Sequence, residues 1–380
     1  MSPTPAERDV LTAPEPPLWS VRDQAWIIDD HATAALVLGD PAFQAVQPAH
    51  TLRRVAARLG RDYPDLDAVL SGTQIFQSGP IHAGTRQVVR AFQARMRARF
   101  AKARLDADAR RLAEGLQAGE VEAVSALADP LPIAIFAESL DLDADTIRLL
   151  RETGRALKAL WRPMPPISLY GELDAACRAA RQAIAGRVHF GDLRAEAGAE
   201  LDYPLHDLLL FLVSMPVDST AGTISGALEL LSADPGLQAF LRDRPSAMPG
   251  FVGEALRLNG PNRRLHRVLG EARIIAGASL PRGASVAIDL DRVHRDPSVY
   301  SDPERIVPDR RQKASFGFGA GAHACQGTSM GLLQAVSLIE ALLSAWQIVP
   351  AASPPTLTLD PNLRSYERLP LRVSPRVHRR

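Results

Sequence analysis

A loop of small residues around Cys325 carries the clearest chemical signal in this sequence. It runs from Phe316 to Gly327, and its glycines and alanines let the backbone lie close against a flat ligand. Cys325 stands just before an apolar stretch, Gly327 to Trp346, whose three- and four-residue spacing predicts a helix. The N-terminus of a helix favours a thiolate over a thiol. The spacing therefore makes Cys325 a candidate thiolate ligand.

A thiolate is the donor that a haem iron needs to cleave an O–O bond, so haem is the leading interpretation of this loop. Other interpretations are a buried structural cysteine and an ordinary glycine loop. Gly317 to Ala322 also resembles a dinucleotide-binding fingerprint, which would make the chain a nicotinamide-dependent dehydrogenase. The context disfavours the dehydrogenase, because Pro308 to Ser315 does not have the pattern of a buried strand.

Composition limits the class of protein. The chain has 380 residues, 46% of them hydrophobic, and its 44 basic side chains almost balance 43 acidic ones. A net charge of +1 argues against a nucleic-acid partner. The two cysteines, Cys177 and Cys325, predict no disulfide framework. The longest apolar run, Leu208 to Val217, is too short to span a bilayer, and Met1 to Leu18 lacks a signal core. We expect a cytoplasmic protein with no membrane contact.

The hydrophobic periodicity predicts a mainly α protein with small β-sheets. Helices are expected at Gly84–Arg104, Val121–Leu140, Asp145–Leu160, Leu173–Phe190, Leu205–Leu231, Ala247–Leu258 and Gly327–Trp346. Strands are expected between Val268 and Leu290 and near Leu357 and Leu371. No repeat or long linker divides the chain. We expect a flexible segment over residues 1–18 and a single domain over residues 19–380.

The pattern Phe318-Gly319-x-Gly321-x-His323-x-Cys325-x-Gly327 resembles the haem-binding signature of the cytochrome P450 superfamily. The resemblance implies the P450 fold, a single triangular domain. Haem b would be buried in it between an oxygen-activation helix and the helix after the cysteine loop. It further implies that Cys325 is the iron ligand and that Phe318, His323 and Gly327 contact the cofactor.

Other positions fit the same family. Glu254 and Arg257 resemble its Glu-x-x-Arg helix, and with Arg305 they would form a buried network that holds the cysteine loop. His82 and Arg86, with the i,i+4 spacing of one helix face, resemble ligands of the haem propionates. Arg267 and His323 would complete that set, since buried carboxylates need cationic or hydrogen-bonding partners.

The oxygen-activation helix departs from the family pattern. Met215 and Pro216 replace two small residues, whereas Asp218 keeps the acid and Ser219 the hydroxyl, with Thr220 next to it. The resemblance implies that Asp218, Ser219 and Thr220 serve a proton relay. Proline removes an N–H donor and clashes with the carbonyl of Leu212, so we expect the helix to be opened or kinked at Pro216.

The resemblance implies a monooxygenase that uses dioxygen to oxidise a small organic molecule, in secondary metabolism. An alternative is a peroxide-using or non-oxygenating haem-thiolate enzyme, which the unusual Met215-Pro216 pair keeps open. We expect a monomer that receives electrons from an acidic ferredoxin-type donor with its reductase. The candidate docking residues are Arg90, Arg95, Arg97, Arg99, Lys102, Arg310, Arg311 and Lys313.

The substrate pocket is expected to be lined by Asp62–Gln77, Trp161–Tyr170, Met215–Ser219, Asn262–His266 and Leu363–Glu367. Arg263 and Arg264 lie where the family places apolar residues that contact substrate. We therefore expect one of these arginines to bind an anionic group on the substrate, because a guanidinium binds a carboxylate through two hydrogen bonds.

Overall fold

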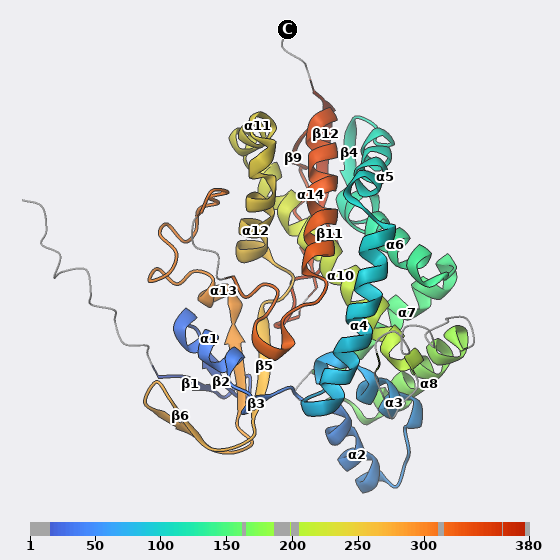
Figure 1. Cartoon of the computed structure of the whole chain (residues 1–380), viewed down its shortest axis with the longest axis vertical. Helices are drawn as coiled ribbons and strands as arrows, with labels where there is room; N and C mark the ends of the chain where they lie inside the picture. Colours follow the sequence, from blue (N-terminus) through green and yellow to red (C-terminus); the bar gives the residue numbers. More distant parts are fainter. Residues whose placement is uncertain are drawn as a thin grey trace, which may run out of the picture.

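The computed structural model describes residues 16–161, 165–185, 198, 205–310, 315–358 and 360–376. Helices dominate this part of the chain, and the strands form small sheets, as Figure 1 shows. The predicted fold class, mainly α with small β-sheets in the P450 fold, is confirmed.

The α-helices are α1 His31–Gly39, α2 Pro48–Leu59, α3 Pro64–Gly72, α4 Gly79–Arg99, α5 Lys102–Glu114, α6 Pro130–Leu140, α7 Ala144–Leu157, α8 Ile167–Ile184, α10 Leu205–Ser232, α11 Pro235–Asp243, α12 Met248–Asn259, α13 Leu290–Val293 and α14 Thr328–Ala345. Short 3₁₀ turns are η2 Gln74–Phe76, η4 Lys158–Trp161, η5 Pro245–Ala247 and η6 Gly321–His323, and η3 Val124–Ala128 is a π-helix. The strands are β1 Leu18–Ser20, β2 Ala25–Ile28, β3 Phe43–Gln44, β4 Gly119–Glu122, β5 Arg264–Leu269, β6 Arg273–Ile275, β7 Ala278–Leu280, β8 Ser285–Asp289, β9 Trp346–Pro350, β10 Thr356–Leu357, β11 Tyr366–Arg368 and β12 Pro370–Pro375.

The largest sheet pairs strands from the start of the chain with strands that follow helix α12. Its strand order is β1-β2-β8-β5-β3, with β2 parallel to β8 and β5 antiparallel to β8. A parallel pair requires a crossover, and here most of the helices lie between β2 and β8 in sequence. In Figure 1 this sheet lies at one side of the molecule and α2, α3, α7 and α8 lie at the other. The pairing with β8 places Arg267 of β5 on a rigid element.

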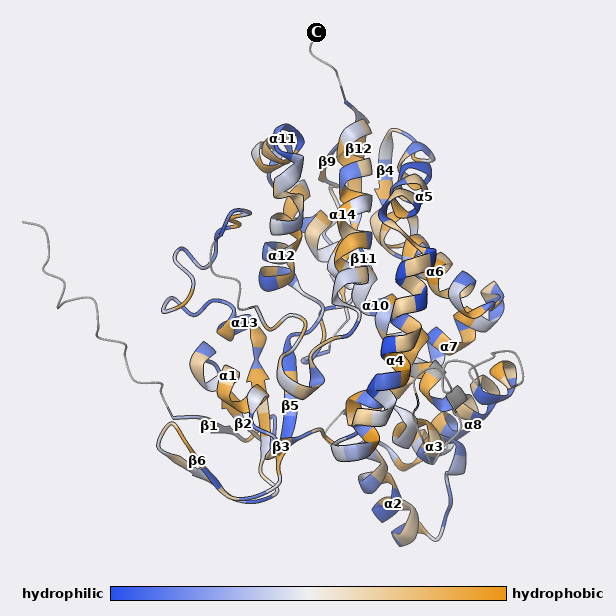
Figure 2. Ribbon diagram, in the orientation of Figure 1, coloured by the Kyte–Doolittle hydropathy of each residue, from blue (hydrophilic) through white to orange (hydrophobic). Residues whose placement is uncertain are grey.

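Helix α10 runs through the core. Val213, Val217, Ile224 and Leu228 have no exposed surface, and the helix contacts α3, α6, α7, α12 and α14. A helix that is apolar around most of its circumference is buried in this way. In Figure 2 the peripheral helix α4 carries hydrophilic as well as hydrophobic residues, as expected for a helix with one side in solvent. Helix α10 is therefore a core helix, whereas α4 has one side in solvent.

Helix α14 is also long and apolar enough to cross a bilayer by length and composition. More than half of it, however, is buried inside the protein, where it packs against α5, α10 and α12. We therefore interpret α14 as a core helix.

Several predicted helix boundaries are wrong, and local chemistry explains them. The expected helix Gly84–Arg104 is two helices, because α4 ends where the buried Phe100 leaves helical geometry and α5 starts at Lys102. The expected helix Val121–Leu140 contains β4, the π-turn and α6, which starts with Pro130 at its first position. The predicted end of Leu173–Phe190 lies outside the described residues beyond position 185.

Helix α10 is not broken at Pro216. It continues from Leu205 to Ser232 with the proline inside it, so of the predicted opening or kink at Pro216 the opening is wrong, and the kink stays a prediction. Val213 and Val217 are fully buried on either side of the proline, and packing of this kind holds a helix together where local propensity does not. Pro216 still deprives the Leu212 carbonyl of its N–H donor.

A buried ion cluster centred on Glu254 ties α12 to the segment before the cysteine loop. Arg257 donates to both carboxylate oxygens at 2.8 and 2.9 Å, and Arg310 Nε and the Val307 N–H each donate at 3.0 Å. Burial raises the pKa of Glu254, but the hydrogen bonds from Arg257, Val307 and Arg310 outweigh it and hold the pKa below its usual range. The cluster therefore keeps an ionised carboxylate in the interior.

The second arginine of this cluster is Arg310, and the prediction of Arg305 is wrong. The Arg305 side chain is 75% exposed and lies 3.7 Å from Asp302, whereas the Arg310 side chain is 5% exposed. Arg305 contributes only its backbone carbonyl, which accepts hydrogen bonds from Arg257 and Arg310.

We predict that Arg310→Ala lowers the free energy of unfolding by about 3–5 kcal/mol, because it removes one partner of a buried charge pair. The matched variant Arg305→Ala should change it by less than about 0.5 kcal/mol, as expected for an exposed side chain. Urea denaturation of the purified protein measures both. Equal losses in the two variants would contradict this assignment.

Candidate functional site

The cysteine loop presents Cys325 on a tight framework of backbone hydrogen bonds. The Cys325 N–H donates to the carbonyl of Phe318 at 2.8 Å, and Thr328 Oγ1 donates to the Cys325 carbonyl at 2.9 Å. Gly319 and Gly321 have φ values of +66° and +64°, which side chains disfavour. Cys325 is exposed, whereas Cys177 is buried. The fold therefore offers the sulfur of Cys325, and not that of Cys177, to a ligand.

Gly327 and Phe318 lie close to this sulfur, as the motif predicts. A Cβ atom on Gly327 would lie 3.7 Å from Cys325 Sγ, at van der Waals contact, so Gly327 lies directly beside the sulfur. Phe318 is partly buried and contributes its carbonyl to the loop.

Three elements bring His82, Arg86, Arg267 and His323 together beside the loop. The rings of His82 on α4 and His323 on η6 stack with centroids 4.0 Å apart. Arg86, one turn after His82, donates to the Ala324 carbonyl at 2.9 Å. Arg267 on β5 is 9% exposed and donates to the carbonyl of its neighbour His266. The four residues that the sequence predicted as one set therefore lie together beside the cysteine loop.

This set has no carboxylate partner among the described residues. Burial, followed by the charges of Arg86 and Arg267, lowers the pKa of His82 to about 4. Burial, followed by His82, Arg267 and Arg86, lowers the pKa of His323 to about 3. The pKa values of Arg86 and Arg267 are also lowered, mainly by burial, and no carboxylate of the described residues offsets the effect. His82 Nε2 is buried and has no hydrogen-bond partner among the described residues. Such a set is suited to binding an anion.

His294 connects the ion cluster of Glu254 to the cysteine loop. The Phe316 N–H donates to His294 Nε2 at 2.9 Å, and Nδ1 lies 3.0 Å from the Arg257 carbonyl. Because Nε2 accepts, the ring proton is on Nδ1 and donates to that carbonyl. Burial is the largest effect on this ring and lowers the pKa of His294 to about 4. The neutral ring therefore serves both bonds at once.

Asp218 on α10 is surrounded by cations. Arg151 Nε donates to it at 2.7 Å, Arg155 donates twice at 3.0 Å, and Lys158 Nζ lies at 3.3 Å. Burial raises the pKa of Asp218, but the hydrogen bond from Arg155 and the charges of Lys158, Arg155 and Arg151 outweigh it and lower the pKa overall. Arg151 also binds Asp129. Asp218 is therefore an ionised carboxylate in a shared cluster.

Sequence reasoning missed these cations, although a signal was present. Arg151, Arg155 and Lys158 are spaced four and three residues apart, which places them on one face of α7 and its extension. Gly154 on the same segment allows α7 to approach α10 closely, since a Cβ atom there would collide with Ser214.

The hydroxyls next to Asp218 point in different directions. Ser219 Oγ donates to the Pro216 carbonyl at 3.3 Å. Thr220 is buried, and a Cβ atom on Gly331 of α14 would lie 3.8 Å from its hydroxyl, so Thr220 faces α14. Thus Asp218 and Ser219 are adjacent in sequence but make no hydrogen bond to each other here.

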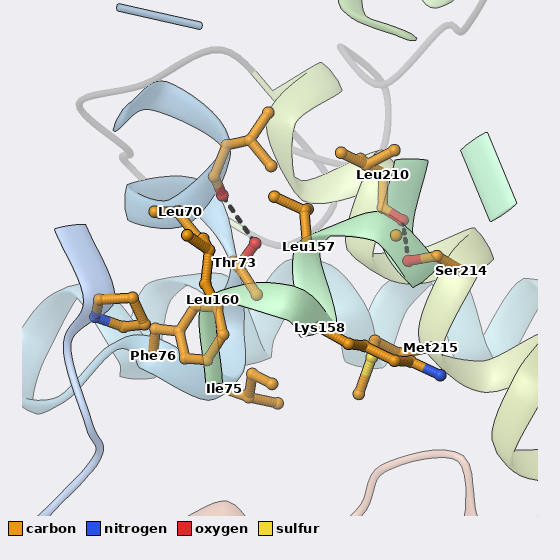
Figure 3. A pocket seen from close by; sticks show the side chains of 13 residues that line it. Leu70, Thr73, Ile75, Phe76, Leu157, Lys158, Leu160, Leu210, Ser214 and Met215 are labelled. Carbon is orange, nitrogen blue, oxygen red and sulfur yellow. Dashed lines mark hydrogen bonds between the residues drawn. The ribbon is translucent and has the colours of Figure 1, made fainter. Parts of the chain in front are cut away.

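A mainly apolar cavity lies beside Met215 and Ser214 of α10, as Figure 3 shows. The predicted wall Asp62–Gln77 contributes Val69, Leu70, Thr73, Ile75 and Phe76. The described residues of the predicted wall Trp161–Tyr170 do not line this cavity, and Leu157, Lys158 and Leu160 line it instead. The predicted segments Asn262–His266 and Leu363–Glu367 do not line it either.

The expected role of Arg263 and Arg264 is not supported. Arg263 forms an ion pair with Asp291 at 2.7 Å, and Arg264 forms one with Asp23 at 2.7 Å. Both guanidinium groups therefore already have carboxylate partners from the protein.

The predicted docking set divides in a similar way. Arg90, Arg95, Arg97 and Arg99 on α4 and Lys102 on α5 are exposed, but Arg310 is buried in the Glu254 cluster. Arg311 and Lys313 lie outside the described residues.

Sequence comparison gives this arrangement a family. A profile described as cytochrome P450 matches residues 247–366. A Mycobacterium tuberculosis protein named beta-dihydromenaquinone-9 omega-hydroxylase is 29% identical over 183 residues, which is 48% of this chain and 37% of that protein. The chain thus matches little more than a third of that relative's length. Cytochrome p450 CYP199A2 of Rhodopseudomonas palustris is 28% identical over 316 residues, covering 78% of this chain and 74% of that protein.

Solved structures agree. The cytochrome P450 enzyme CxnD, described as acting in C–S bond formation in chuangxinmycin biosynthesis, has a TM-score of 0.78 at 25% identity and covers 93% of this chain and 89% of its own. CalO2 has a TM-score of 0.81 at 22% identity, with 95% and 93% covered, and this likeness shows the fold.

The P450 fold and the exposed cysteine beside Arg86 and the buried Arg267 are the arrangement expected of a haem protein. The profile match, the bacterial relatives and the solved structures together support the cytochrome P450 superfamily, a family that implies a haem cofactor. The residues present fit that group. His82 Nε2 has no hydrogen-bond partner and Arg86 and Arg267 have no carboxylate partner among the described residues, and the negative haem propionates would supply both. The dehydrogenase alternative finds no support, since no described residue between β8 and Cys325 lies in a strand.

We predict that the protein loses stability as the pH falls from 6.5 to about 4, in part through His294. In this range the unfolded chain takes up a proton on His294 that the folded chain excludes, so the stabilisation is complete above this range and disappears as the pH falls through it. Protonation of Nε2 would also break its bond to Phe316. Chemical denaturation across this range should show a weaker pH dependence for His294→Asn than for the wild type.

The exposed His50 provides the matched control for this experiment. His50→Asn should keep the wild-type pH dependence. If both variants follow the wild-type curve, His294 does not contribute to the acid sensitivity.

Proposed function

We propose that this protein is a haem-thiolate monooxygenase that uses dioxygen to oxidise a small organic molecule. The observation that carries the proposal is the pair of the half-buried Arg86 and the buried Arg267, which no carboxylate of the described residues offsets, beside the exposed Cys325. A structural cysteine loop would need no such group, because unpaired buried charge destabilises a fold.

Each residue of the site has a proposed part in holding haem b. Cys325 is the iron ligand, and Arg86, Arg267, His82 and His323 bind the propionates. His82 offers its unpartnered Nε2, and the neutral state that its lowered pKa favours still leaves one ring N–H to donate. Phe318 and Gly327 shape the loop against the cofactor. When bound, a thiolate-ligated haem supplies the activation of dioxygen.

Asp218, Ser219 and Thr220 are proposed to deliver protons on the opposite side of the cofactor. Asp218 is ionised and contacts Arg151, Arg155 and Lys158. The Arg155 side chain is half exposed, so the cluster reaches solvent. Ser219 donates to the Pro216 carbonyl by a bond of 3.3 Å, which is long for a hydroxyl donor and costs little to exchange. The proposed route runs from solvent through Asp218 to Ser219 once Ser219 leaves the Pro216 carbonyl, with the buried Thr220 as the deeper member.

The remaining proposals follow from the family and the surface. Electrons come from an acidic ferredoxin-type donor with its reductase, which docks on the exposed basic residues of α4 and α5, Arg90, Arg95, Arg97, Arg99 and Lys102. The protein acts as a cytoplasmic monomer without a membrane or nucleic-acid partner, on a small molecule of secondary metabolism.

A peroxide-using or non-oxygenating haem-thiolate enzyme is the second candidate. Met215 favours it, because this large side chain lines the cavity where the family usually has a small residue. Turnover with peroxide and without any reductase is the behaviour that separates this candidate from the first.

We predict that Asp218→Asn and Ser219→Ala keep haem but divert electrons from product to hydrogen peroxide by about tenfold or more, as expected for loss of a general acid pathway. Product and peroxide are measured against the reduced nicotinamide consumed, with a ferredoxin and its reductase as donors. Ser225→Ala, a buried serine on the same helix, is the control and should remain coupled. Normal coupling in both relay variants would contradict the relay and favour the peroxide-using candidate.

A further inference from the structure

The cluster around Asp218 carries more positive than negative charge. Arg151, Arg155 and Lys158 supply three cations, and Asp129 and Asp218 supply two carboxylates, so three minus two leaves one positive charge. The described residues give these cations no third carboxylate. A surplus cation that is largely removed from water is costly unless another anion approaches it.

Lys158 differs from the other two cations in position. Arg151 is 10% exposed and is fixed between Asp129 and Asp218, and Arg155 is 50% exposed on the solvent side. Lys158 is 18% exposed and makes the longest of the contacts to Asp218, at 3.3 Å. It is also the member of the cluster that lines the apolar cavity. Figure 3 shows its side chain extending beside Met215.

The other polar side chains of the cavity wall have already used their donors. Thr73 Oγ1 donates to the Val69 carbonyl at 2.6 Å, and Ser214 Oγ donates to the Leu210 carbonyl at 2.7 Å. Figure 3 shows both bonds turned into the backbone of the helices. Among the residues that line the cavity, the Lys158 ammonium, with three N–H groups and a flexible stem, is the donor left for a guest.

We propose that Lys158 is a specificity residue that binds the carboxylate of a substrate with an otherwise apolar body. The inference rests on the proposed function and names its substrate class. The apolar wall of Leu70, Ile75, Phe76 and Leu160 accommodates the body, and the surplus charge of the cluster accommodates the anion. Asp218 keeps Arg151 and Arg155 as partners when Lys158 turns to the guest. Arg263 and Arg264 do not compete for this role, because both are paired with acids of the protein.

Calorimetric titration with matched acids and amides tests the proposal. The probes are 4-phenylbutanoate and decanoate, each with its neutral amide, added to the purified protein whose haem content is read from its absorption spectrum. We expect the wild type to bind at least one acid about tenfold or more tightly than its amide. K158Q should reduce that preference to about twofold or less by weakening the acid and leaving the amide unchanged, while K158R should keep it.

R155Q is the matched control, since it also removes one cation from Asp218 but not from the cavity wall. It should keep the preference for the acid. Equal loss in R155Q and K158Q, equal affinity for acid and amide in the wild type, or no binding of any probe would overturn the inference. A protein that holds no haem but prefers the acid through Lys158 would support the inference and overturn the proposed function. A haem-loaded protein without the preference would overturn the inference alone.

Discussion

The cysteine loop has little regular secondary structure, so its position depends on the buried ion cluster that Glu254 forms with Arg257 and Arg310. Two hydrogen bonds through His294 connect this cluster to the start of the cysteine loop. The Arg257 carbonyl accepts from His294, which in turn accepts the Phe316 N–H at the start of the loop. Such a cluster is sensitive to substitution, because removal of one buried charged group leaves the charge of its partner uncompensated. The ion cluster acts together with apolar packing, because Phe316 at the start of the loop also belongs to the apolar core beside the sheet.

The charge clusters of this molecule differ in how completely they are balanced, and the difference follows their roles. Around Glu254 every charged group has close partners, as a structural support requires. No carboxylate of the described residues offsets Arg86 and Arg267, as a site for an anionic cofactor requires. The Asp218 cluster lies between these cases, with a carboxylate that has more donors than it needs. Charged groups without a protein partner of opposite charge thus mark candidate binding sites for another molecule.

Much of this arrangement could be predicted from the sequence, and the failures have physical causes. The Cys325 motif and the His82–Arg86 spacing located the site, because both depend on local geometry that sequence spacing records. Arg310 was missed in favour of Arg305, since only the folded meander decides which of two nearby arginines turns inward. The break at Phe100 and the continuity of α10 through Pro216 depend on tertiary packing, which overrides local propensity. The position of Lys158 at the cavity and near Asp218 depends on how α7 packs against α10, which the sequence does not record.

The central claim is that the Cys325 thiolate ligates a haem held by this fold. The absorption spectrum of the reduced, carbon monoxide-bound protein tests it most directly, in the wild type and in the variants Cys325→Ala and Cys177→Ala. We expect the strongly red-shifted Soret band of thiolate ligation in the wild type and in Cys177→Ala, because Cys177 is buried, and its loss in Cys325→Ala. A wild type without that band, or a Cys325→Ala protein that keeps it, would contradict the account.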